Sequence, residues 1–163
     1  MQKKQAIITI CLLAVIIAAI VLVFNGGLPG GKPPELKVSN ELNITIKAQR
    51  GTYNWHRGNS YICADSMGPL GLYKLGELKG IEPSENDDYS LILKFGKKPE
   101  SVAVVIYPES AATTEANSTM ISRPVSGPLS GYKFTVPSDG IYIVNVHATW
   151  SKGDCYYYFY TTP

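Results

Sequence analysis

The stretch GTYNWHRGNSYICADS, residues 51–66, gathers residue types that carry out catalysis and bind metals. It contains His56 and Cys63. The chain has one other histidine, His147, and outside an apolar N-terminal run it has one other cysteine, Cys155. Two histidines and two cysteines form a ligand set that zinc accepts. A cysteine beside a histidine, such as Cys63 with His147, can also act as a nucleophilic pair.

The spacing of these residues supports neither chemistry. The sequence has no C-x-x-C or H-x-x-x-H pattern and no G-x-S-x-G nucleophile elbow. The glycines of GLPGG follow no soluble strand, so they do not indicate a phosphate-binding loop. Asp65 is expected to accept hydrogen bonds from the turn that follows it. We therefore expect no catalytic residue, metal or cofactor, and no enzymatic activity.

A β-hairpin explains the same stretch. Arg57-Gly58-Asn59 is a turn-type sequence between two runs rich in aromatic and β-branched residues. With residues 58 and 59 at the tip, side chains alternate between an apolar face and a polar face. The expected pairs are Trp55–Ile62 and Tyr53–Ala64 on the apolar face, and His56–Tyr61 and Asn54–Cys63 on the other.

A second hairpin is predicted at the C-terminus, with Lys152-Gly153 at its tip. Its core face is expected to hold Tyr142, Val144 and the pairs Trp150–Cys155, Ala148–Tyr157 and Val146–Phe159. The opposite face is expected to pair Thr149 with Tyr156, His147 with Tyr158, and Asn145 with Tyr160. Because tyrosine recurs at recognition surfaces, these six residues form a candidate recognition patch. The alternative, which the pattern favours, is that they only stabilise the sheet as cross-strand pairs.

The face assignments also bear on the cysteines. Two extracellular cysteines can form a disulfide, but Cys63 falls on an outer face and Cys155 on an inner one. The assignments favour two free thiols. A three-residue turn at residue 58 would move Cys63 to the inner face, so the disulfide stays open.

The rest of the chain beyond residue 35 is predicted to be β structure. The expected strands are residues 41–48, 52–56, 60–65, 88–95, 101–108, 131–137, 141–150 and 155–161, with loops at 69–80 and 111–130. In the first strand, Leu42, Ile44, Ile46 and Ala48 alternate with polar residues, which is typical of a half-buried strand. About eight short strands with regular turns predict an all-β fold, an Ig-like antiparallel β-sandwich. Tyr142, after an Asp-Gly turn, has the position of a tyrosine corner, whose hydroxyl bonds to nearby backbone.

The N-terminus predicts a membrane anchor. Residues 6–24 are nineteen positions without a charge, Pro or Gly, and a helix of about 20 residues crosses a bilayer. Lys3 and Lys4, in the basic tip at residues 1–5, place the N-terminus in the cytoplasm. A cleaved signal peptide is the alternative, although the run is long and ends in bulky residues. The Gly- and Pro-rich residues 25–34 are an expected flexible linker, and residues 35–163 an extracytoplasmic domain.

Charge excludes one class of partner. Apart from Lys3 and Lys4, the chain has 13 basic residues against 13 acidic ones. A net charge of zero gives no electrostatic case for binding nucleic acid.

Three motifs resemble a known group of proteins: GTYNW with YICADS, then KKPESVAVVIYP, then GYKFTVPSDGIYIVNVHATW with GDCYYYFY. Together they are similar to a small exported domain of Gram-positive bacteria, found in membrane-anchored or lipoprotein-like proteins. It also occurs as an extracellular appendage of sensor-transducers similar to the β-lactam receptors. The likeness covers about residues 46–161. The chain departs from the pattern at Asn54, often Ser in the group, and at Tyr107, often Trp. The resemblance implies a β-sandwich and carries over no catalytic residue.

These features predict a membrane-tethered extracytoplasmic module that is not catalytic and that binds or assists at the cell envelope. The expected partners are the membrane, through residues 6–24, and an envelope protein or glycan at the recognition patch. An envelope structural or assembly protein acting through its anchor helix is the first alternative. A hydrolase is the second, and the sequence offers no constellation for it.

Overall fold

The computed structural model describes residues 31–57, 59–82, 90–113, 121–123, 125, 127 and 131–163. A compact unit spans Pro33–Pro163. The basic tip, the membrane helix predicted for residues 6–24 and most of the predicted linker lie outside the described residues. Among the residues that are described, no helix is long and apolar enough to cross a membrane.

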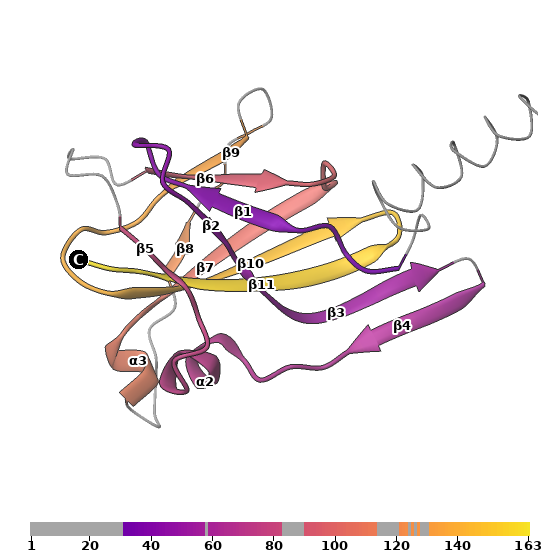
Figure 1. Cartoon of the computed structure of the whole chain (residues 1–163), viewed down its shortest axis with the longest axis horizontal. Coiled ribbons are helices and arrows are strands. Elements are labelled where there is room, and N and C mark those ends of the chain that lie inside the picture. The colour runs from indigo at the N-terminus through magenta and orange to yellow at the C-terminus, as the bar shows by residue number, and fades with distance from the viewer. Residues whose placement is uncertain are drawn as a thin grey trace, which may run out of the picture. The chain divides into compact units, whose positions relative to one another are not determined.

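Two sheets, antiparallel apart from one short parallel pair, make the compact unit an all-β sandwich, as predicted (Figure 1). The four-stranded sheet has the order β2 (Thr45–Lys47), β1 (Leu36–Ser39), β6 (Ser90–Phe95), β9 (Tyr132–Thr135). The seven-stranded sheet has the order β4 (Ser60–Ala64), β3 (Gln49–Arg57), β11 (Gly153–Thr161), β10 (Tyr142–Trp150), β7 (Ser101–Pro108), β8 (Ile121–Arg123). The parallel pair joins β5 (Gly80–Ile81) to β11.

The core lies between the two sheets. Alternate residues of each strand point inward because side chains in a strand alternate between faces. Trp55 on β3 and Trp150 on β10 meet edge to face, with ring centroids 5.6 Å apart. Phe95 of the smaller sheet packs against Trp150 at 5.9 Å and so joins the two layers. The fully buried core side chains include Leu36, Val38, Leu91, Leu93, Ile106, Val144, Val146, Tyr157 and Phe159.

The strand predicted for residues 41–48 is wrong in its first half. Only residues 45–47 form β2, and Leu42 and Ile44 are 65% and 45% exposed. Asn40 ends β1 in a tight turn, because its side-chain oxygen accepts a hydrogen bond from the Ile44 amide at 2.9 Å. Asn43 adopts a positive φ of 62° inside this turn, a conformation that asparagine tolerates well. Local side-chain bonding of Asn thus overrides the apolar alternation.

Several elements are additional to the eight predicted strands. Strand β1, with the sequence LKVS, is a short strand that the sequence analysis missed; β8 falls in a segment predicted as a loop, and β5 begins at the end of the other such segment. The same two segments contain short helices, α2 (Pro69–Lys74) and α3 (Ser110–Thr113). Six and four residues are too few to show helical periodicity in a sequence. Figure 1 places both helices on the side of the larger sheet that faces away from the smaller one.

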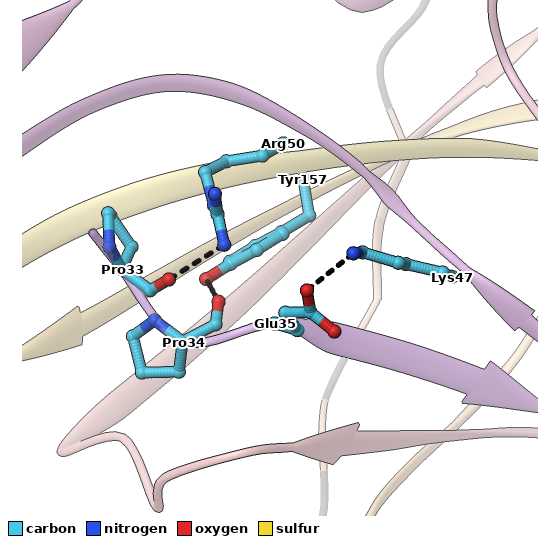
Figure 2. Close-up of polar contacts among 6 residues, drawn as sticks. All are labelled: Pro33, Pro34, Glu35, Lys47, Arg50 and Tyr157. Atoms are coloured by element: carbon cyan, nitrogen blue, oxygen red, sulfur yellow. Dashed lines mark hydrogen bonds and ion pairs between the residues drawn. The ribbon is translucent and has the colours of Figure 1, made fainter. Parts of the chain in front are cut away.

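The N-terminal end of the compact unit is fixed to the sandwich by three contacts (Figure 2). Arg50 Nη2 donates to the carbonyl of Pro33 at 2.8 Å, Tyr157 Oη donates to that of Pro34, and Lys47 pairs with the Glu35 carboxylate. The hydrogen bond from Lys47 is the main reason that the pKa of Glu35 lies below its usual value. The compact unit therefore begins at Pro33, whose carbonyl is bound by Arg50.

Candidate functional site

The face assignment of the C-terminal hairpin is confirmed, but its register is shifted. All the residues predicted for the core face are at least partly buried in the main core. The predicted pairs are wrong, because the turn is at Ser151-Lys152 and not at Lys152-Gly153. The observed pairs on the outer face are Thr149–Asp154, His147–Tyr156, Asn145–Tyr158 and Ile143–Tyr160.

Gly153 explains the shift. It lies in β11, opposite Trp150 on one side and Trp55 on the other. Its φ is +138°, and a Cβ at this position would lie 2.0 Å from the Asn54 carbonyl oxygen. The glycine is therefore required by the close approach of β3 and is not part of the turn tip. The pairing moves by two residues, so every side chain keeps its predicted face; an odd shift would have reversed them all.

The hairpin of β3 and β4 has the predicted register. Trp55 pairs with Ile62 and points into the core, whereas His56 pairs with Tyr61 on the outer face. The two outer rings meet edge to face with centroids 4.0 Å apart. Cys63, opposite Asn54, is exposed.

One half of the outer face of the larger sheet is covered. Helix α2 contacts β10 and β11, and Leu72, Leu78 and Ala112 form a second apolar cluster with Ile143 and Tyr158. Tyr158 is only 4% exposed.

The tyrosine rings in this half lie close to glycines. A Cβ on Gly51 would lie 2.2 Å from the ring of Tyr158. Tyr160 packs edge to face on Tyr73 with centroids 5.2 Å apart, and its ring lies 2.7 Å from the position of a Cβ on Gly80. Two of the six residues predicted for the recognition patch, Tyr158 and Tyr160, therefore belong to the packing beneath α2 and β5.

The other half of this face lies outside this second cluster except at Tyr156, which packs against the cluster's edge, and we call this half the open face. A polar row crosses five strands in register: Cys63, Asn54, Asp154, Thr149 and Ser101. Beside the row stand His56, Tyr61, His147 and Tyr156. Together these nine residues define the open face.

Contacts within the open face order its side chains. His147 Nε2 lies 3.2 Å from an Asp154 carboxylate oxygen, and the imidazole stacks on the Tyr156 ring at 4.3 Å with an angle of 12°. The hydroxyls of Ser101 and Thr149 are hydrogen-bonded at 2.5 Å. Tyr61 is 59% exposed.

The open face does not assemble the chemistry considered from the sequence. Cys63 and His147 are three strands apart, a separation of about 14 Å, and Cys155 points into the core. Within the described ranges, no group of three His, Cys, Asp or Glu side chains is placed to hold a metal ion.

Asn145, the remaining residue of the predicted patch, lies between the two halves, opposite Tyr158. Its amide oxygen is buried and has no hydrogen-bond partner in the described part of the chain.

Two side chains make contacts other than those expected. Asp65 accepts a hydrogen bond from the Thr52 hydroxyl of β3 at 3.1 Å, not from the turn that follows it. The Tyr142 hydroxyl donates to the Asp139 carboxylate at 2.5 Å and not to backbone, so the tyrosine-corner bond is replaced by a side-chain one. This hydrogen bond is the main cause of the raised pKa of Tyr142.

The two thiols are expected to react very differently. Cys63 is exposed, whereas burial raises the pKa of the Cys155 thiol to about 12. Because only the thiolate is alkylated, iodoacetamide at pH 8 should modify Cys155 in the folded chain about a hundredfold or more slowly than Cys63. Without reductant, denaturant should make both reactive. Peptide mass spectrometry separates them from Cys11, and a Cys63–Cys155 crosslink would contradict the expectation.

Sequence reasoning missed two members of the polar row, Asp154 and Ser101. A hairpin with Lys152-Gly153 at its tip and a strand that begins at residue 155 leaves Asp154 outside the predicted strand. The hairpin register is set by the packing of Gly153 against β3, and this register places Asp154 beside His147.

Comparison with known proteins found no matching family model, curated protein or solved structure for this chain.

Proposed function

We propose that the chain is a non-catalytic binding module of the cell envelope and that the open face is its recognition surface. In this proposal the unit is an Ig-like domain, held outside the membrane by residues 6–24, with a cytoplasmic N-terminus. One observation carries the proposal. Helices α2 and α3 bring apolar side chains to one half of the outer face, whereas the other half holds aromatic rings and polar groups in register.

The chemistry of the open face fits an envelope glycan. Tyr61 and His56 offer exposed ring surface, and the adjacent row supplies amide, hydroxyl and carboxylate groups. Flat aromatic surface binds the apolar faces of sugar rings, and the polar groups bond to sugar hydroxyls. An envelope protein is the second candidate partner, because tyrosine is also enriched at protein interfaces.

The test measures retention of residues 33–163 on isolated envelopes. The variant Asn54→Ala/His56→Ser/Tyr61→Ser removes exposed groups, and each change should lower the free energy of unfolding by no more than about 1 kcal/mol, the upper range for a cross-strand pair. We expect retention to fall at least tenfold. The control Lys37→Ala/Thr135→Ala, with exposed residues of the smaller sheet, should be retained like the parent. Equal retention of both variants would refute the proposal.

Two further arms identify the partner and test the anchor hypothesis. Retention that is lost after glycan digestion of the envelopes, and kept after protease treatment, indicates a glycan; the reverse indicates a protein. In the full chain, residues 6–24 are replaced by an unrelated apolar helix. An assembly protein acting through its anchor would lose function, whereas the proposed module should keep it.

A further inference from the structure

A cavity of about 290 Å³ lies at a corner of the smaller sheet, away from the open face. It forms at the end of β6, where β6 extends beyond the first residue of its neighbour β9. The pairing of β6 with β9 stops at Leu93 and Tyr132, whereas its pairing with β1 continues through Lys94 and Phe95. Gly131, the residue before β9, has a φ of +91° and lies close to β6, where a Cβ would lie 2.8 Å from Ile92. The ladder between β6 and β9 thus stops before Lys94 and Phe95.

Part of the cavity wall is made of apolar side chains that are held in place. Phe95 and Tyr132 line it and meet edge to face with centroids 5.5 Å apart. The Tyr132 hydroxyl donates to the Pro99 carbonyl at 3.2 Å, and the Trp150 indole N–H donates to the Lys97 carbonyl at 3.0 Å. These two bonds fix the turn between β6 and β7, which forms the opposite wall. A concave, pre-formed site that combines apolar side chains with a few polar groups is typical of small-ligand binding.

The rim of the cavity is basic. Lys94 and Lys98 line it, both are exposed, and neither forms an ion pair within the described part of the chain. On the outward face of the smaller sheet Lys94 is opposite Lys37, which is in turn opposite Lys47. Like charges directly opposite each other destabilise a sheet. Of these three lysines, Lys47 is paired with Glu35, so the rim of the cavity carries the charges of Lys94 and Lys98.

We propose that this cavity is a binding site for a small amphipathic carboxylate. The apolar part of the ligand packs against Phe95 and Tyr132, and its carboxylate lies between the ammonium groups of Lys94 and Lys98. The site is separate from the proposed recognition surface, because it lies on the other sheet and shares no residue with the open face.

The probe is 3-(4-fluorophenyl)propionate, observed by fluorine NMR with the full chain in an uncharged detergent and corrected for binding to detergent alone. Lys94→Gln/Lys98→Gln should raise its dissociation constant at least tenfold. The control Lys74→Gln/Lys79→Gln removes the same charge from exposed residues of α2 and the segment after it. This control should leave the constant unchanged.

Two more measurements use the parent protein. The neutral amide of the probe should bind at least tenfold more weakly, and the carboxylate should protect Lys94 and Lys98, but not Lys74 and Lys79, from acylation as read by mass spectrometry. Equal binding of acid and amide, protection elsewhere, or unchanged affinity of Lys94→Gln/Lys98→Gln would overturn the proposal. Competition by inorganic phosphate that matches the carboxylate would show a plain anion site and would also overturn it.

Discussion

Replacing Trp150 by alanine is expected to lower the free energy of unfolding by about 3–5 kcal/mol, the usual loss for a large core aromatic. Trp150 is buried, and its ring contacts both Trp55 and Phe95. Phe95 comes from the smaller sheet, so the substitution opens a cavity where the two sheets meet. Trp55→Ala should cost a similar amount, because Trp55 is equally buried on the adjoining part of the larger sheet.

Phenylalanine variants separate packing from hydrogen bonding at these positions. The Trp150 indole N–H donates to the Lys97 carbonyl at 3.0 Å, whereas the Trp55 indole nitrogen is buried without a partner among the described residues. Both substitutions remove the same atoms, but only Trp150→Phe breaks a bond. We therefore expect Trp150→Phe to be less stable than Trp55→Phe by about 1 kcal/mol.

The measurement is urea unfolding followed by circular dichroism, so that the loss of fluorescence from either tryptophan does not affect it. Losses below about 1 kcal/mol for both alanine variants would mean that neither ring packs between the sheets. The reverse order of the two phenylalanine variants would contradict the assigned hydrogen bond.

The alternation of apolar and polar residues along the strands accounts for most of the correct predictions. The register of β3 and β4 follows from a two-residue turn, and the strands on either side alternate cleanly, so Trp55 and His56 were placed on the correct faces. The inner face of β10 and β11 was predicted for the same reason. Where a side chain competes with the backbone, as Asn40 does after β1, alternation misleads and Leu42 is left exposed.

Contacts between distant segments could not be predicted. The burial of Tyr158 depends on α2, whose six residues carry no periodic signal. The cavity depends on where β9 begins relative to the end of β6, directly after Gly131 with its positive φ. The open face was therefore predicted only in part. Its strands and orientation were found, but its limits are set by helices packed from elsewhere in the chain.

Gly153→Ala is expected to destabilise the unit by about 3 kcal/mol or more, through two effects that add. Its φ of +138° is a conformation that residues with a Cβ rarely adopt, and such strain alone costs about 1–3 kcal/mol. A Cβ would also lie 2.0 Å from the Asn54 carbonyl oxygen, which is backbone within β3. Because no side chain can rotate to relieve this overlap, β3 has to move away from β11.

Gly140→Ala is the matched control, because a Cβ there would meet nothing within 4 Å and its φ is not in the positive range. We expect it to range from neutral to about 1 kcal/mol stabilising, through the lower entropy of the unfolded chain. Hydrogen exchange adds a spatial readout. Gly153→Ala should lose amide protection along the ladder between β3 and β11 and keep it between β10 and β7. Equal stability of the two variants, or an equal loss of protection in both ladders, would show that Gly153 is not pressed against β3. The register that brings Asp154 beside His147 would then be wrong.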